Sequence, residues 1–242
     1  MTVRPAFAVL WILLATALAC AKVKVDDRES AGAERLPRPA HIFVEDFVAA
    51  PEDVPSDSSV TAHTSGDHPP QTPEQIALGR QVGSELASEL AGEIAAMGLP
   101  AEHATSEPSP ALNDLVIRGT LLSVVAGSEA ERVAIGMGKG AAELKVAVEG
   151  YQMTTNGLRK LGSGTLDTSA GKTPGAAVSG VAAIATKNPL GLIVSTGMKL
   201  HDEKTGKSTI HGKAKDVAKQ IAAELRPRFE SQGWIPPSQG TH

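Results

Sequence analysis

Two rows of side chains that recur every four residues run along residues 73–97 and constrain the fold more than any other feature. One row is apolar and large: Leu78, Val82, Leu86, Leu90 and Ile94. The neighbouring row is small: Gly79, Gly83, Ala87, Ala91 and Ala95. This spacing is typical of an amphipathic α-helix, and small side chains allow a second surface to approach closely. The pattern predicts a helix against its own sheet; a seam with a partner helix is the alternative.

The ends of this helix are marked as clearly as its faces. Thr72, Pro73 and Gln75 occupy the N-cap, N1 and N3 positions, which is the arrangement of a capping box. Gly98 suits the left-handed residue that ends a helix, and Pro100 prevents the helix from resuming.

A second helix is expected from about residue 213 to 231, with Lys and Arg on its polar face. Its apolar stripe consists of Val217, Ile221, Leu225 and Phe229. Pro227 is expected to kink it. Gly233 is expected to end it, with Trp234 folding back as a cap contact.

Strands are predicted at 41–49, 115–125, 143–153 and 158–168. In the first, Phe43 and Phe47 are expected on one face and Val44 on the other. Gly119 in the second indicates a bulge or a close approach. A turn at 155–157 joins the last two into an antiparallel meander. The fold class is therefore α+β, with a small mixed, largely antiparallel sheet packed by a long N-terminal and a C-terminal helix.

The remaining segments are poor in regular patterns. Residues 50–71 and 100–111 contain Pro and Ser and predict loops. Residues 170–200 are rich in Ala, Gly, Ser and Val, and neither half is long enough to cross a bilayer as a helix. This segment is either a loop or helical pair that covers the sheet, or a hairpin that contacts a membrane or a neighbouring subunit.

Three patterns could carry chemistry, and each has a structural interpretation. Glu45 and Asp46 are adjacent acids at the end of a strand, where they are expected to face solvent. His63 and His68 lie five apart without further ligands at fixed spacing. Residues 136–140 (GMGKG) match neither phosphate-binding fingerprint. We therefore predict no enzyme activity, no cofactor and no metal site.

The N-terminus predicts export. Arg4 precedes an apolar run at residues 6–19, which is short for a membrane span and typical of a signal peptide. The sequence Ala-Leu-Ala-Cys at 17–20 resembles a lipoprotein box, although its Ala17 and Leu18 are exchanged relative to the usual pattern. Cys20, the only cysteine, is thus the expected lipidation site, and no internal disulfide can form. The alternatives are a retained anchoring helix and an ordinary signal peptide.

The expected organisation follows from these signals. Residues 1–19 are the signal peptide, 20–40 the lipidated cysteine with a flexible tether, 41–235 a single domain and 236–242 a disordered tail. The resemblance to lipoproteins, with Ala21 rather than Asp after the cysteine, implies the periplasmic face of the outer membrane. The partner is then the membrane, through the lipid anchor.

Charge argues against nucleic acid as a partner. Without residues 1–19 the chain has 22 basic and 27 acidic side chains, a net charge of −5. Nucleic-acid-binding proteins show a basic excess, and aromatic residues for base stacking make up only 3% of the chain.

Several stretches together resemble the uncharacterised family catalogued as domain of unknown function 4410. They are IFVEDF at 42–47, TPEQIALGRQVGSELASEL at 72–90, LVIRGTLLSV at 115–124, ERVAIGMGKGAAELKVAVEGY at 131–151, GKTPGAA at 171–177 and QGWI at 232–235. The resemblance covers roughly residues 40–235. It implies an envelope lipoprotein and no particular chemistry.

Two functions are favoured over a hydrolase of the envelope, because the seven His residues show no motif with Ser or Asp neighbours. The first is a non-enzymatic component that binds a protein partner or forms a homo-oligomer. The anchor, the tether, the small helix row and the Gly-rich segment support it. The second is a carrier of a small molecule or lipid in an apolar cleft between sheet and helices.

Overall fold

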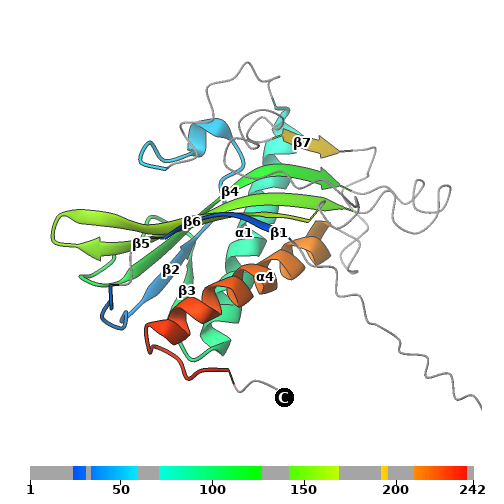
Figure 1. Ribbon diagram of the computed structural model, residues 1–242. Helices are drawn as coiled ribbons and strands as arrows, with labels where there is room; N and C mark the ends of the chain where they lie inside the picture. Colours follow the sequence, from blue (N-terminus) through cyan, green and yellow to red (C-terminus); the bar gives the residue numbers. More distant parts are fainter. Residues whose placement is uncertain are drawn as a thin grey trace, which may run out of the picture.

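A computed structural model describes residues 34–58, 71–126, 142–168 and 210–238, and the backbone of 24–30 and 192–195. One sheet carries two helices, α1 (Pro73–Ala96) and α4 (Ile210–Ser231), which lie side by side on the same face (Figure 1). The strands are β1 (Lys24–Ser30), β2 (Ile42–Glu45), β3 (Ala101–Ala104), β4 (Leu115–Ala126), β5 (Glu143–Thr154), β6 (Gly157–Asp167) and β7 (Leu192–Ser195), with a short 3-10 helix at Pro51–Asp53.

The strand order is β1-β6-β5-β4-β2-β3. The neighbours from β1 to β4 are antiparallel, whereas β2 runs parallel to both β4 and β3. β7 also pairs with β4 in parallel, beyond the end of the β2 ladder. Because the antiparallel ladders are the long ones, the sheet is mixed and largely antiparallel, which confirms the expected α+β class.

The predicted meander is confirmed almost residue for residue. β4, β5 and β6 begin and end within one or two residues of the expected positions. Gly157 has a φ of 102° in the turn between β5 and β6, a backbone conformation that favours glycine.

Helix α1 also begins as expected. Thr72 accepts a hydrogen bond from the Gln75 amide at 3.3 Å, and its own amide donates to Gln75 Oε1 at 2.8 Å. This is a complete capping box. After the helix, Gly98 has a φ of 85°, as the left-handed residue beyond a helix end requires.

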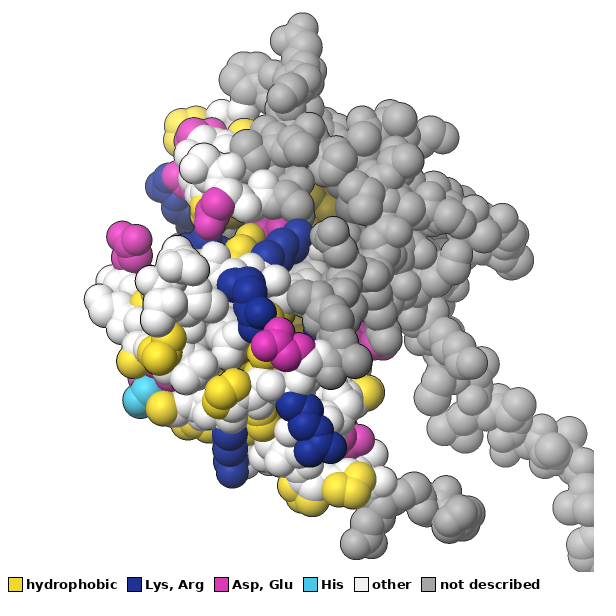
Figure 2. All heavy atoms as spheres, turned by 60° about the vertical axis from the view of Figure 1, so that its left-hand side comes forward, with side chains coloured by type: hydrophobic (Ala, Val, Ile, Leu, Met, Phe, Trp, Pro, Cys, Tyr) yellow, Lys and Arg dark blue, Asp and Glu magenta, His cyan; other side chains and the backbone are white. Residues whose placement is uncertain are grey.

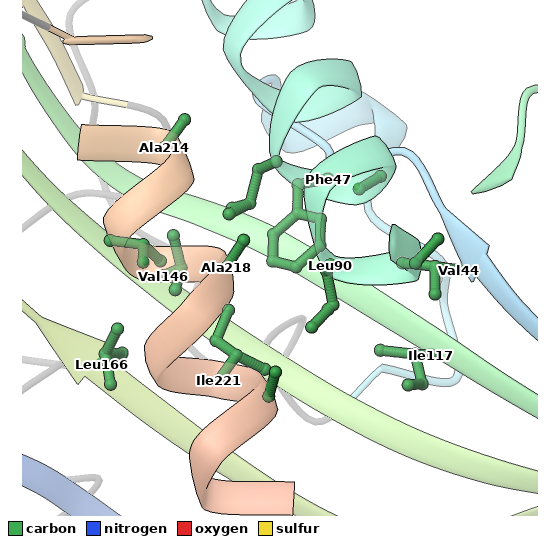
Figure 3. Packing of buried hydrophobic residues seen from close by; sticks show 14 of the residues in the cluster. Val44, Phe47, Leu90, Ile117, Val146, Leu166, Ala214, Ala218 and Ile221 are labelled. Atoms are coloured by element: carbon green, nitrogen blue, oxygen red, sulfur yellow. The ribbon is translucent and has the colours of Figure 1, made fainter. Parts of the chain in front are cut away.

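Phe47 is the point where helix and sheet meet, and it corrects one prediction. Phe43 stays partly exposed and stacks on His41, whereas Phe47 is 1% exposed. The reason is that β2 ends at Glu45 and the chain then turns inward. Figure 3 shows the Phe47 ring in the middle of the core, next to Leu90 of α1.

Two glycines make room for Phe47. Its amide donates to the Gly83 carbonyl of α1 at 3.3 Å, and a Cβ on Gly83 would overlap the Phe47 carbonyl oxygen. On the other side, a Cβ on Gly119 of β4 would overlap the Phe47 ring. The small row of α1 is thus used inside the domain, as predicted, and Gly119 is a site of close approach.

The C-terminal helix ends as predicted, although Pro227 lies within it. Gly233 has a φ of 74°. The Trp234 amide donates to the Phe229 carbonyl at 3.0 Å, and the two rings lie 5.8 Å apart. Trp234 therefore folds back onto the helix end.

The tether is shorter than expected. We predicted a flexible segment over residues 20–40, but the backbone of Lys24–Ser30 forms β1 at the edge of the sheet. Leu36 packs against the core as well. The sequence of β1 is charged and lacks an apolar alternation, so only its backbone pairing reveals it.

Two more strands lie in segments predicted as irregular. β3 falls in the expected loop 100–111, and its sequence Ala-Glu-His-Ala has little apolar character. β7 falls inside the Gly-rich segment 170–200, whose other residues lie outside the described ones. Cys20, His63, His68, residues 136–140 and 239–242 also lie outside them.

At the surface, apolar side chains form several small patches separated by Lys and Arg side chains (Figure 2). Among the described residues, no helix combines the length and the apolar character that a membrane span needs.

Candidate functional site

An apolar cleft of about 370 Å³ lies between α4 and the β5–β6 half of the sheet. Binding sites for small molecules are clefts of about 300–1,000 Å³ with mostly apolar walls. Its lining includes Leu36, Leu115, Ile117, Val148, Leu161, Leu166, Ile221, Leu225, Phe229 and Trp234. The cleft therefore has the size and the lining of a site for an apolar ligand.

The floor of the cleft includes three strand residues that lack side chains, Gly150, Gly162 and Gly164. Gly150 of β5 pairs with Gly162 of β6, Val148 pairs with Gly164, and all four line the cleft. Glycine within a strand lowers its stability and often marks a place where a ligand or another backbone comes close. A Cβ on Gly150 would meet nothing within 4 Å. Unlike Gly83 and Gly119, Gly150 is therefore not required by packing inside the domain.

One wall of the cleft comes from the apolar stripe of α4. Ile221, Leu225 and Phe229 line the cleft at intervals of four residues, and Trp234 follows the helix end. Ile221 and Phe229 are buried, whereas Leu225 is partly exposed. The sequence predicts this stripe as a packing face, and the structure shows that part of it borders open space.

The segment that precedes β2 contributes Leu36 to the lining of the cleft. The Leu36 amide donates to Gln232 Oε1 at 2.7 Å, and Gln232 Nε2 donates to the Glu34 carbonyl at 3.0 Å. Trp234 Nε1 donates to the Leu36 carbonyl at 3.3 Å. These bonds fix Leu36 against the end of α4, next to the cleft that it lines.

The rim of the cleft is polar. Arg228 is half-buried, and its Nη2 donates to the Leu161 carbonyl at 3.3 Å, which holds the guanidinium beside β6. Glu224, one turn earlier on α4, also lines the cleft but is exposed. An apolar interior with charged groups at its edge suits an amphiphilic ligand.

The opposite face of the sheet carries a buried carboxylate. Glu149 is 3% exposed. Its Oε2 accepts from Ser58 Oγ at 2.5 Å and from Tyr151 Oη at 3.2 Å, and Lys160 Nζ lies 3.2 Å from its Oε1. These bonds tie the segment at Ser58 to β5 and β6. The carboxylate is therefore a structural anchor with its hydrogen bonds satisfied.

Arg118 extends this network. Its guanidinium lies 3.1 Å from carboxylate oxygens of both Glu45 and Asp57, and 5.2 Å from the centre of the Tyr151 ring. Burial lowers the pKa of Arg118, but the two carboxylates raise it by more. Burial also raises the pKa of Tyr151, with a further contribution from Glu149.

Glu45 gives this network a pH dependence. Burial raises the pKa of Glu45 above its ordinary value of 4.5, and Arg118 offsets only part of that effect. Because the folded state binds this proton more tightly than the unfolded state does, the contribution of Glu45 to stability is complete below pH 4.5 and is lost as the pH rises through the folded pKa.

We expect the substitution Glu45→Gln to remove this contribution. Urea unfolding of the wild type and the variant between pH 4 and 7 measures this contribution. The excess free energy of unfolding of the wild type over the variant should decrease as the pH rises. A difference that is independent of pH would contradict the assigned burial of Glu45.

The adjacent acids Glu45 and Asp46 thus contact different partners. Glu45 bonds to Arg118, whereas Asp46 lies 2.6 Å from His103 Nε2 of the neighbouring strand β3. Within the described ranges, no three His, Cys, Asp or Glu side chains gather in a way that could hold a metal ion.

The cleft was expected only as one of two alternatives, and its floor was not foreseen. The signal that could have found it is the set of glycines at 150, 162 and 164 within two strongly patterned strands. Without the register that pairs Gly150 with Gly162, their common location is invisible in the sequence.

The sequence of the chain matches one protein-family model. The model described as domain of unknown function (DUF4410) matches residues 42–186, more than half of the chain. The chain belongs to this family. The match confirms the resemblance seen in the sequence, and it includes β2, α1 and the glycine floor but ends before α4.

Other comparisons add little. No curated protein matches the chain. Among solved structures, a PelC dodecamer from Paraburkholderia phytofirmans is similar at 11% identity and a TM-score of 0.39, covering 84% of this chain and 97% of that one. A single-substitution variant of that dodecamer gives 12% and 0.40 with the same coverage. Similarity at this level is too low to transfer a function or an assembly state.

Proposed function

We propose that this member of the DUF4410 family is a non-enzymatic lipoprotein of the bacterial envelope that binds an apolar, lipid-like molecule in the cleft between α4 and the β5–β6 hairpin. The lipid on Cys20 would hold it at the periplasmic face of the outer membrane. Every described strand and helix lies after residue 23, so the anchor leaves the domain intact.

The observation that carries this proposal is the open space above Gly150. Elsewhere in the described core, residues such as Phe47, Leu86, Leu90 and Ile94 are nearly or fully buried. Beside Gly150, the same sheet leaves an apolar space of ligand size. A well-formed apolar cleft of this size is the usual location of a small-molecule site.

The sequence favoured a role in assembly, but one of the observations that favoured it has another explanation. The small row of α1 was the proposed partner seam, but Gly79, Gly83, Ala87 and Ala91 are buried within the domain. Among its other supports, the Gly-rich segment falls outside the described residues apart from β7, and a lipid anchor suits either function. Ligand binding is therefore the function that the geometry favours.

A neutral fluorescent probe tests the cleft directly. We expect N-phenyl-1-naphthylamine to bind a chain that starts at Ala21, with a rise in fluorescence on burial. The substitution Gly150→Val should reduce the binding at least about tenfold by filling the floor, while a β-branched residue suits the strand.

Gly92→Ala is the matched control. Gly92 lies on the exposed face of α1, and a Cβ there also meets nothing within 4 Å. It should stabilise the helix by about 1 kcal/mol and leave probe binding unchanged. Equal binding by wild type and Gly150→Val would overturn the proposed site.

The anchor has its own test. Cells that express the full chain should incorporate radioactive palmitate into it, and the Cys20→Ala variant should incorporate none, because Cys20 is the only thiol. Wild-type protein that carries no label would remove the anchor from the proposal while leaving the cleft untouched.

A further inference from the structure

We infer that residues 34–38 form a lid through which the ligand enters and leaves the cleft, and that Gln232 is the residue that holds this lid shut. This inference rests on the proposed function and adds the route by which the cleft is filled. The lid precedes β2 in the chain and contributes Leu36 to the lining of the cleft.

Two prolines keep the lid apart from the sheet. Its residues are Glu-Arg-Leu-Pro-Arg, and Pro39 follows directly. Pro37 and Pro39 have no backbone N–H to donate to a strand ladder, and their fixed φ makes the segment stiff. Residues 34–38 accordingly form neither helix nor strand. Such a segment can swing outward as a unit without breaking a ladder.

Side chains of distant segments hold the lid in place. Gln232 accepts from the Leu36 amide at 2.7 Å and donates to the Glu34 carbonyl at 3.0 Å. Trp234 donates to the Leu36 carbonyl at 3.3 Å, and Arg159 of β6 lies 3.0 Å from the Glu34 carboxylate. The lid therefore reaches from the end of α4 to β6, the elements between which the cleft lies.

The end of the lid that continues into β2 is fixed to the domain. Arg38 Nη2 donates to the Gly98 carbonyl at 2.9 Å, and the His41 amide donates to Asp114 Oδ1 at 2.9 Å. Residues 39–41 are therefore the pivot, and the Gln232 side of the lid is the side that opens.

The other walls of the cleft are held more firmly. In α4, Ala214, Val217 and Ala218 are 0% exposed, and this helix packs along α1 (Figure 1). The β5–β6 floor is a continuous antiparallel ladder. Within the lid, Leu36 is partly buried and the other four residues are exposed. Segments that bury few apolar groups open at the lowest free energy, so the lid is the wall that moves.

Stopped-flow kinetics of N-phenyl-1-naphthylamine with the chain starting at Ala21 test the role of Gln232. Gln232→Ala removes two bonds of the lid in the free and in the ligand-bound protein alike, so the lid opens more often in both. We expect the association and the dissociation rate constants each to rise about tenfold, while the Kd changes less than about threefold. A residue that only shapes the lining would change the dissociation rate and the Kd together.

Ser231→Ala is the matched control. The Ser231 hydroxyl donates to the Arg228 carbonyl at 2.8 Å, a bond at the same helix end that does not involve the lid. Both rate constants of this variant should equal those of the wild type. Faster dissociation of Gln232→Ala without faster association would overturn the lid.

A reversible cross-link tests the lid independently. The chain starting at Ala21 contains no cysteine, so the substitutions Glu34→Cys and Arg159→Cys can be joined selectively by a bifunctional methanethiosulfonate reagent. The cross-link should slow association and dissociation at least about tenfold, and a reductant should restore the rates of the double variant before cross-linking. Equal rates with and without the cross-link would overturn the lid and leave the proposed function standing. If the probe does not bind the wild type, the proposed function fails and the lid fails with it.

Discussion

Replacing Phe47 by alanine is expected to lower the free energy of unfolding by about 3–5 kcal/mol, as for other fully buried phenylalanines. The side chain is 1% exposed and lies between α1 and the sheet. Urea unfolding followed by circular dichroism measures the loss. A cost below about 1 kcal/mol would contradict the central position of this ring.

The neighbouring glycines turn this prediction into a double-mutant cycle. Gly119→Ala should cost about 1–3 kcal/mol in wild type, because its Cβ overlaps the Phe47 ring. In the Phe47→Ala background the ring is absent, and the same substitution should cost almost nothing. The coupling energy between the two positions is therefore expected to be about 1–3 kcal/mol.

Gly83→Ala provides the contrast. Its Cβ meets the backbone oxygen of Phe47 rather than the ring, so its cost should be similar in both backgrounds. If Gly119→Ala also costs the same in both, the ring does not lie against β4 as described.

The substitution Glu149→Ala is expected to lower the free energy of unfolding by about 2–4 kcal/mol, since it removes a buried carboxylate that accepts two hydrogen bonds from hydroxyl groups. The glutamate side chain is 4% exposed, and its loss leaves Ser58, Tyr151 and Lys160 without the carboxylate that they contact. Urea unfolding followed by circular dichroism measures this loss of stability.

An exposed ion pair is the control for this effect. Arg80 Nη2 lies 3.4 Å from Asp53 Oδ2, and the two side chains are 64% and 37% exposed. Arg80→Ala should therefore cost at most about 1 kcal/mol. Equal losses for Glu149→Ala and Arg80→Ala would contradict the buried environment of Glu149.

The features that the sequence predicted well are those encoded by local patterns. The capping box of Thr72 and Gln75, the four-residue repeats of both helices and the turn at Gly157 each depend on residues close together in the chain. Local rules of helix and turn formation are therefore sufficient for them.

The features that were missed depend on pairing between distant segments. β1 and β3 have little apolar character, and their partners β6 and β2 are far away in the sequence. Phe47 was placed on the wrong face because the strand was expected to continue past Glu45. Period-two patterns locate a strand but not the residue at which tertiary contacts end it.

The sequence could predict the type of candidate site but not the residues that form it. An apolar cleft between sheet and helices was one of two alternatives, but its floor requires the pairing of Gly150 with Gly162.

Mass spectrometry of lipids extracted from the full-length protein, purified from cells, tests the central claim most directly. Gly150→Val and Gly92→Ala protein, prepared in parallel, provide the comparison. We predict about one lipid-like molecule per chain, beyond any lipid attached to Cys20, in wild type and Gly92→Ala, and a large reduction in Gly150→Val. Equal amounts in all three proteins, or none in any, would contradict a lipid-binding cleft.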